Sequence, residues 1–155
     1  MRILGIDPGI AIVGFGIVDV MPKGLVAGKY GHISTESTTP VPDRLKILYD
    51  DTCSIIKEYR PDVVAYEELF FNKNVKTAIV ASHARGVLVL AAVNCGVPVA
   101  EYTPLQVKQA VVGYGRASKQ QVQIMVTQLL RLKEIPKPDD TADALAVAIC
   151  HANSM

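Results

Sequence analysis

Acidic side chains stand at three places where the sequence predicts that a strand ends or a helix begins. Asp7 and Glu67 each close a short, β-rich apolar run, and Asp140 and Asp143 fall in the first turns of a predicted helix. Because Asp140 and Asp143 are three positions apart, they share one face of that helix. Ligands of open α/β sheets bind outside the carboxyl ends of the strands. If the strands before Asp7 and Glu67 are parallel neighbours, both carboxylates emerge at that edge.

These four carboxylates together predict a divalent metal site. Carboxylates that converge without cationic partners repel one another, and oxygen-only ligand sets suit Mg²⁺ or Mn²⁺. Two Mg²⁺ ions held in this way support in-line phosphoryl displacement, because they stabilise both the attacking and the leaving oxygen. Each acid also has a structural interpretation, as a turn former, a helix cap or a partner of the helix dipole. The distribution of charge along the chain decides between these interpretations.

Basic side chains are concentrated in one part of the sequence, although the formal net charge of the 155 residues is only +1. Residues 72–137 carry nine Lys or Arg and two acidic residues, a local balance of +7. Residues 1–71 and residues 138–155 each have a balance of −3. Such asymmetry is typical of proteins that bind nucleic acid. Acidic flanks around a basic segment therefore favour a metal-dependent nuclease, in which the basic residues hold phosphates around an acidic centre.

The composition excludes several other classes of protein. The three cysteines are widely spaced and form no Cys-x-x-Cys pair, so we predict free thiols rather than a disulfide framework or a zinc ribbon. The first residues hold no apolar signal segment, and no apolar stretch approaches the roughly 20 residues that span a bilayer. We therefore expect a cytoplasmic protein without a membrane partner. Neither a Walker A loop nor a Gly-x-Ser-x-Gly motif is present.

The periodicity of apolar residues predicts one α/β domain that spans residues 1–155. The predicted strands cover residues 3–6, 10–20, 25–35, 62–67 and 98–102. The predicted helices cover residues 42–60, 75–94, two segments of 104–132 separated at 113–115, and 139–152. The first three strands form an antiparallel meander, whereas the last two cross over through helices and run parallel to the first. The helix at 75–94 is apolar nearly all round, which indicates burial in a core or against a partner chain.

Seven short motifs occur in order along nearly the whole chain, and they resemble the RuvC family of Holliday junction resolvases. They are Leu4-Gly5-Ile6-Asp7-Pro8-Gly9, Tyr66-Glu67-Glu68-Leu69-Phe70, Ala84-Arg85-Gly86, Gln106-Val107-Lys108-Gln109, Val111-Val112-Gly113, Lys119-x-Gln121-Val122 and Asp140-Thr141-Ala142-Asp143-Ala144-Leu145-Ala146. The resemblance implies a ribonuclease H-like fold with a five-stranded mixed sheet flanked by helices. It also implies a homodimer that binds four-way DNA junctions in recombination and repair and nicks two strands of like polarity symmetrically. A branch-migration motor is the partner complex that it implies.

The resemblance also assigns roles to individual residues. Asp7, Glu67, Asp140 and Asp143 match the four catalytic, metal-binding positions, which implies two Mg²⁺ ions per subunit with Mn²⁺ as a substitute. Some family members carry histidine where this chain has Asp140. The adjacent acids Glu68 and Asp139 do not fall on the pattern.

Five further residues are candidates for DNA binding. Phe70 matches the aromatic residue that the family presses against bases at the junction centre, and Lys108 and Lys119 match basic residues near the scissile phosphate. Arg116 and Lys73 are candidate phosphate contacts from their positions in the sequence. The helix at 75–94 matches the helix through which the family dimerises.

Other classes of function compete with this interpretation. One alternative is a junction-binding module that does not cut, and a second is a ribonuclease H-like nuclease that acts on RNA–DNA hybrids. A third is an actin-like phosphotransferase, but such enzymes usually need two duplicated domains, and this chain shows no internal repeat. His151 lies about two turns after Asp143 near the same helix face, so the sequence leaves its role open.

Overall fold

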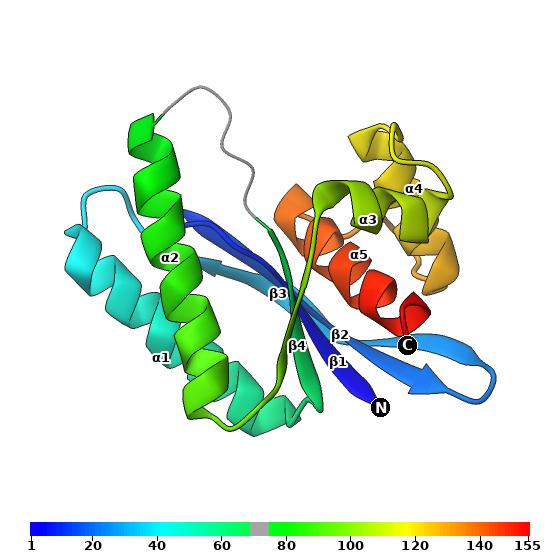
Figure 1. Cartoon of the computed structure of the whole chain (residues 1–155), viewed down its shortest axis with the longest axis horizontal. Coiled ribbons are helices and arrows are strands. Elements are labelled where there is room, and N and C mark those ends of the chain that lie inside the picture. Colours follow the sequence, from blue (N-terminus) through cyan, green and yellow to red (C-terminus); the bar gives the residue numbers. More distant parts are fainter. Residues whose placement is uncertain (69–74) are drawn as a thin grey trace.

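The computed structural model describes residues 1–68 and 75–155, and its centre is a five-stranded mixed sheet (Figure 1). The strands are β1 (Arg2–Asp7), β2 (Ile12–Met21), β3 (Gly24–Ser34), β4 (Val63–Glu67) and β5 (Val99–Tyr102). Their order across the sheet is β3-β2-β1-β4-β5. The first three strands pair antiparallel, whereas β4 is parallel to β1 and β5 is parallel to β4. The predicted strand directions are therefore confirmed.

The helices cover both faces of the sheet, as Figure 1 shows. They are α1 (Val41–Tyr59), α2 (Val75–Asn94), α3 (Pro104–Val112), α4 (Lys119–Leu129) and α5 (Asp139–Asn153). One apolar core lies between the sheet and α1 and α2, and a second lies between the sheet and α3, α4 and α5. The predicted order of elements and the break between α3 and α4 are also confirmed.

Side-chain alternation along the two central strands decides which face carries the acids. In β1, Leu4 and Ile6 pack into the core beneath α1 and α2, whereas Ile3 belongs to the core beneath α5. The same alternation places Ala65 of β4 in the core beneath α5. Because successive strand residues point to opposite faces, the side chains of Asp7 and Glu67, the last residues of their strands, lie on the face that α5 covers.

Glycines on β1 and β2 allow α5 to lie unusually close to the sheet. A Cβ atom at Gly5 would lie 2.0 Å from the carbonyl oxygen of Ala144, and one at Gly14 would lie 1.9 Å from the carbonyl oxygen of Asp140. Gly5 is paired with Gly16 across the two strands, and Gly14 is paired with Asp7. The backbone of α5 therefore occupies the space that side chains would otherwise fill, and the start of this helix lies beside Asp7.

Helix α2 differs from one expectation of the sequence analysis. Its 20 residues are long and apolar enough to cross a membrane by length and composition, with a mean hydropathy of 1.4. The expectation that no stretch approaches this length is therefore wrong. Only 22% of the most apolar window is buried within the chain. One such helix is weak evidence for a membrane span, because helices of globular proteins pass the same test.

The contact between α5 and the sheet generates a prediction about stability. We expect Gly5→Ala to lower the free energy of unfolding by about 3 kcal/mol, because the added methyl group overlaps the backbone of α5 and forces the helix outwards. Gly31→Ala is the matched control, because a Cβ there meets only ring atoms of Phe15 at 3.3 Å and 3.4 Å. Urea denaturation of both variants measures the difference. Equal stability of the two variants would contradict the close packing of α5.

Candidate active site

Asp7 and Glu67 lie side by side at the carboxyl edge of the parallel strands. The β1–β4 register pairs Ile6 with Tyr66, so the next residue of each strand carries the acid. Burial, followed by repulsion from Asp143, Glu67 and Asp140, raises the pKa of Asp7 to about 9. Burial and repulsion from Asp143 raise the pKa of Glu67 to about 7. Each carboxylate therefore lies in a poorly solvated environment that already holds negative charge.

The first turns of α5 bring Asp140 and Asp143 to the same edge. The Thr141 hydroxyl donates a hydrogen bond to the carbonyl oxygen of Gly31 at 3.0 Å, which fixes the start of α5 against β3. Burial raises the pKa of Asp143, and Lys119 opposes this effect. The proximity of Asp140 contributes to the raised pKa of Asp7. The four predicted acids are thus brought together, from two strands and one helix.

The oxygens of these carboxylates do not surround a common point. Among residues 1–68 and 75–155, no three His, Cys, Asp or Glu side chains are arranged so that they could hold a metal ion as they stand. The donor chemistry nevertheless suits a hard divalent cation, because all four groups supply carboxylate oxygens. Burial is the main cause of the raised pKa values of Asp7 and Glu67, and repulsion from neighbouring acids adds to it, so a bound cation would relieve part of both effects.

Lys119 is the basic residue in direct contact with the acids. Its Nζ lies 3.3 Å from Asp143 Oδ2 and 3.8 Å from Asp139 Oδ2. Burial lowers the pKa of Lys119, but the pairing with Asp143 and Asp139 outweighs it and the pKa is raised. The lysine is held at the first position of α4 by a capping box. In it, Ser118 N donates to Gln121 Oε1 at 2.7 Å and Gln121 N donates to Ser118 Oγ at 3.2 Å.

A pocket of about 220 Å³ lies beside the acids. It is lined by Glu67, Pro104, Val107, Lys108, Lys119, Val122, Asp143 and Ala146. Lys108, on α3, and Lys119, on α4, face the pocket from the side opposite the strands, and both act to lower the pKa of Glu67. The pocket therefore combines two carboxylates with two ammonium groups, an arrangement that suits a phosphodiester approaching an acidic centre.

A second hollow reaches the acids from another direction. It has a volume of about 640 Å³ and is lined by Gly9, Ile10, Ala11, Ile12, Lys76, Thr77, Val80, Ala81 and Asp140. These residues come from the turn after β1, from β2, from the amino-terminal half of α2 and, in the case of Asp140, from α5. The carboxylates thus lie between two open depressions of the surface.

The remaining candidates are less closely tied to this centre. Phe70 and Lys73 lie outside the described residues. Arg116 is exposed in the turn between α3 and α4 and is not among the described residues that line the 220 Å³ pocket. His151 lies about 12 Å along α5 from Asp143 at the usual rise per residue. There its Nδ1 is 2.7 Å from the Tyr102 hydroxyl, and burial lowers its pKa.

Sequence reasoning missed two contributors to the site. Asp139 is excluded by the motif pattern, yet it contacts the same lysine as Asp143. The spacing of four residues between Asp139 and Asp143 was the available signal, since it places both on one helix face. Gly14 carries no functional group, but its missing side chain is what lets Asp140 approach the sheet.

Comparisons with known proteins agree with this geometry. A family model described as crossover junction endodeoxyribonuclease RuvC matches residues 3–151. The protein of that name from Brevibacillus brevis is 61% identical over 152 residues, which are 98% of this chain and 92% of the relative.

Solved structures give the same result. The structure of Thermus thermophilus RuvC superposes with a TM-score of 0.91 at 38% identity, covering 99% of this chain and 94% of that one. T. thermophilus RuvC in complex with Holliday junction substrate superposes with a TM-score of 0.89 at 37% identity, covering 99% and 93%. The predicted ribonuclease H-like fold is confirmed by these matches. The chain therefore belongs to the RuvC family of crossover junction endodeoxyribonucleases.

Proposed function

We propose that this protein resolves four-way DNA junctions by nicking two strands of like polarity at symmetric positions. The observation that carries the proposal is the half-buried carboxylate cluster of Asp7, Glu67, Asp140 and Asp143, set beside Lys108 and Lys119. Membership of the RuvC family and the likeness to a relative solved with a Holliday junction support it. The products are 5′-phosphate and 3′-hydroxyl ends, which a ligase can rejoin in recombination and repair. The activity belongs in the cytoplasm, with the DNA substrate.

We assign the four acids as ligands of two Mg²⁺ ions per subunit, with Mn²⁺ as a substitute. When bound, such ions supply positive charge that activates a water and stabilises the leaving 3′ oxygen. Small rotations of these side chains would be needed to place three oxygens around one ion. Ion binding would also remove the repulsion that Asp7 experiences from its three neighbours.

The chain's own residues position the DNA. Lys108 and Lys119 line the pocket beside Glu67 and Asp143, where their ammonium groups can hold the phosphates flanking the scissile bond. Arg116 is exposed on the turn between the helices that carry these lysines, which suits a contact with a phosphate further along the strand. We further assign Phe70 to stacking on unpaired bases at the junction centre and Lys73 to a nearby phosphate. Those two assignments rest on sequence alone.

A homodimer through α2 fits the symmetry of a four-way junction. The exposed side of α2 carries Val75, Ile79, Leu90 and Val93. Ile79 and Leu90 are 11 positions apart, close to three full turns, so they lie on the same stripe. Covering this stripe with a second copy explains the apolar composition of the helix without a membrane. The branch-migration motor that works beside the family remains a proposed partner.

The metal assignment predicts the behaviour of Asp7→Asn. The amide keeps the shape of the side chain but removes its charge, so we expect junction binding to be retained and Mg²⁺-dependent cleavage to fall by at least about 100-fold. Electrophoretic binding and cleavage assays with a synthetic four-way junction measure the two effects. Asp51→Asn, an exposed acid on α1, is the matched control and should cut normally. Retained cutting by Asp7→Asn would refute the metal assignment.

The substrate assignment is tested with the unaltered protein. A four-way junction, a linear duplex of the same sequence and an RNA–DNA hybrid are incubated with Mg²⁺, with Mn²⁺ or with chelator. We expect the junction alone to be cut, and only when a metal is present. Cleavage of the hybrid would favour the ribonuclease H alternative, and binding without cleavage would favour the non-cutting module. Either outcome contradicts the proposal.

The position of Lys119 predicts a change in salt dependence. We expect Lys119→Ala to weaken junction binding and to reduce the slope of log affinity against log salt by about one unit, because one phosphate contact is lost. Lys46→Ala is the control, because Lys46 lies on α1 and pairs with Asp50 at 2.5 Å, remote from the acids. Titrations at several salt concentrations give both slopes. An unchanged slope for Lys119→Ala would remove this lysine from the DNA surface.

The dimer assignment predicts the effect of a charge on α2. Leu90 is 50% exposed in the single chain, so Leu90→Asp is expected to fold normally and to weaken dimerisation by at least about 30-fold, since a charge would be buried in an apolar interface. Val26→Asp, at a 51% exposed position of β3, is the control. Sedimentation equilibrium measures both association constants. Equal dimerisation of the two variants would exclude α2 as the interface.

A further inference from the structure

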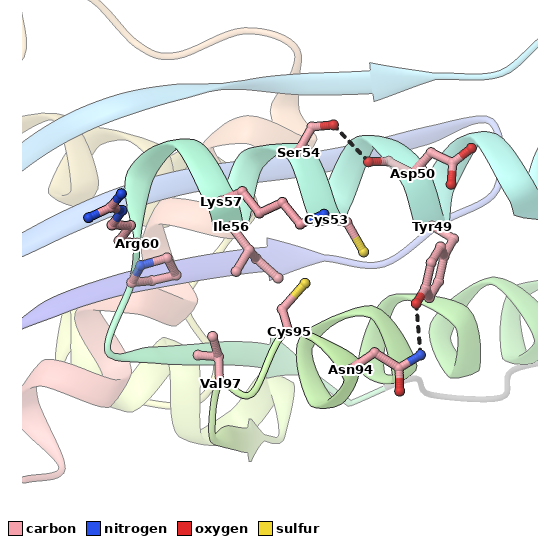
Figure 2. Close-up of a pocket in the computed structure, with 11 residues that line it drawn as sticks. Tyr49, Asp50, Cys53, Ser54, Ile56, Lys57, Arg60, Asn94, Cys95 and Val97 are labelled. Carbon is pink, nitrogen blue, oxygen red and sulfur yellow. Dashed lines mark hydrogen bonds between the residues drawn. The ribbon is translucent and has the colours of Figure 1, made fainter.

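Two thiols face each other in a pocket between α1 and the end of α2. Cys53 lies on α1, and Cys95 follows the last residue of α2. Both line a pocket of about 820 Å³, and Figure 2 shows the two sulfur atoms pointing towards one another across it. The two side chains are close enough that, after burial, the proximity of Cys95 contributes to a raised pKa of the Cys53 thiol.

Contacts around the pair hold the two helices together at this point. Asn94 Nδ2 donates a hydrogen bond to the Tyr49 hydroxyl at 2.7 Å, which joins the last residue of α2 to α1. Cys95 N donates to the carbonyl oxygen of Ala91 at 3.0 Å, so Cys95 still continues the helical turn. Gly96 then adopts a positive φ of 74° and turns the chain towards β5. Cys95 therefore lies at a helix terminus, where the backbone can adjust more readily than inside a helix.

The two thiols differ in their access to solvent. Cys53 is only 9% exposed, whereas Cys95 is half-buried and lines the open pocket. Burial, followed by the proximity of Cys95, raises the pKa of the Cys53 thiol. Cys53 is therefore protonated and shielded, and Cys95 is the sulfur that a small reagent reaches first. The charged residues that line the same pocket are Lys57, Arg60 and Asp50, so cationic groups outnumber the single acid and suit an anionic reagent.

We propose that Cys53 and Cys95 form a reversible intramolecular disulfide by exchange with a small-molecule disulfide that enters this pocket. The Cys95 thiol loses its proton to solvent, and its sulfur attacks the S–S bond of the reagent. One half of the reagent leaves as a thiolate and takes up a proton. Cys53 then loses its proton and attacks the Cys95 sulfur of the mixed disulfide, which releases the second half as a thiol. Two protein thiols are oxidised and one disulfide is reduced to two thiols.

The thiol pair lies near the amino-terminal ends of the parallel strands, whereas the acids lie at their carboxyl ends. Val64 N, near the start of β4, donates to the carbonyl oxygen of Pro98, and Pro98 follows Cys95 by three residues. Asp7 and Glu67, in contrast, lie at the carboxyl ends of the same strands. Oxidation would therefore tie α1 to α2 without contacting the carboxylate cluster, and the inference does not depend on the proposed nuclease activity.

A disulfide here closes a loop of about 40 residues, so it is expected to stabilise the fold. The test uses the full chain, incubated with oxidised glutathione at mildly alkaline pH and then treated with an alkylating agent. The protein is unfolded during alkylation so that buried Cys150 can react, and we expect mass spectrometry to find one alkylated thiol, on Cys150, and a peptide that joins Cys53 to Cys95. The melting temperature should rise by about 5–10 °C and return to its starting value with dithiothreitol.

Single substitutions separate this reaction from nonspecific oxidation. Cys53→Ser should accumulate a stable glutathione adduct on Cys95 and show no rise in melting temperature, whereas Cys150→Ser should behave like the unaltered protein. Melting curves under reducing conditions first establish that each variant is folded. An adduct on Cys95 that never passes to Cys53 in the unaltered protein would overturn the proposal. Covalent dimers, a bond that involves Cys150, or alkylation of all three thiols would also overturn it.

Discussion

The absence of side chains at Gly5, Gly14 and Gly16, on the face of β1 and β2 that packs against α5, is the constraint on which the rest of this structure depends. Gly5 and Gly14 allow backbone atoms of α5 to occupy positions about 2 Å from where a Cβ would stand. A helix kept at the usual distance by larger residues would hold its first turn several ångströms further out. Asp140 and Asp143 would then lie too far from Asp7 and Glu67 to form one cluster. The packing of α5 against these glycines therefore also brings the four carboxylates of the site together.

The close approach has an electrostatic cost that defines the chemistry of the site. The four carboxylates share one edge, where burial, followed by repulsion from neighbouring acids, raises the pKa values of Asp7 and Glu67. Lys119 offsets part of that charge through its pairing with Asp143 at 3.3 Å. The two ammonium groups of Lys108 and Lys119 are fewer than the four acids, so the cluster keeps an excess of acidic groups that suits divalent cations.

The sequence predicts features that depend on local pattern and fails where distant residues meet. The strand ends at Asp7 and Glu67 follow from apolar runs and crossover rules, and Ser118 is recognisable as a helix cap. Two contacts join segments that are far apart in the sequence: Asp139 meets Lys119, and Cys95 approaches Cys53. The periodicity of apolar residues does not predict such contacts. A count of consecutive apolar residues also underestimated the length of the apolar segment in α2. Lys76 and Arg85 interrupt the run, while the average hydropathy of the helix stays high.

Diffraction from crystals soaked in Mn²⁺, with anomalous differences measured near the manganese edge, tests the central claim directly. The account predicts two anomalous peaks per chain, enclosed by the carboxylates of Asp7, Glu67, Asp140 and Asp143, with Lys119 turned away from Asp143. The peaks should vanish in Gly14→Ala crystals, in which α5 is displaced from the sheet. Peaks at another site, or full occupancy in Gly14→Ala, would contradict the account.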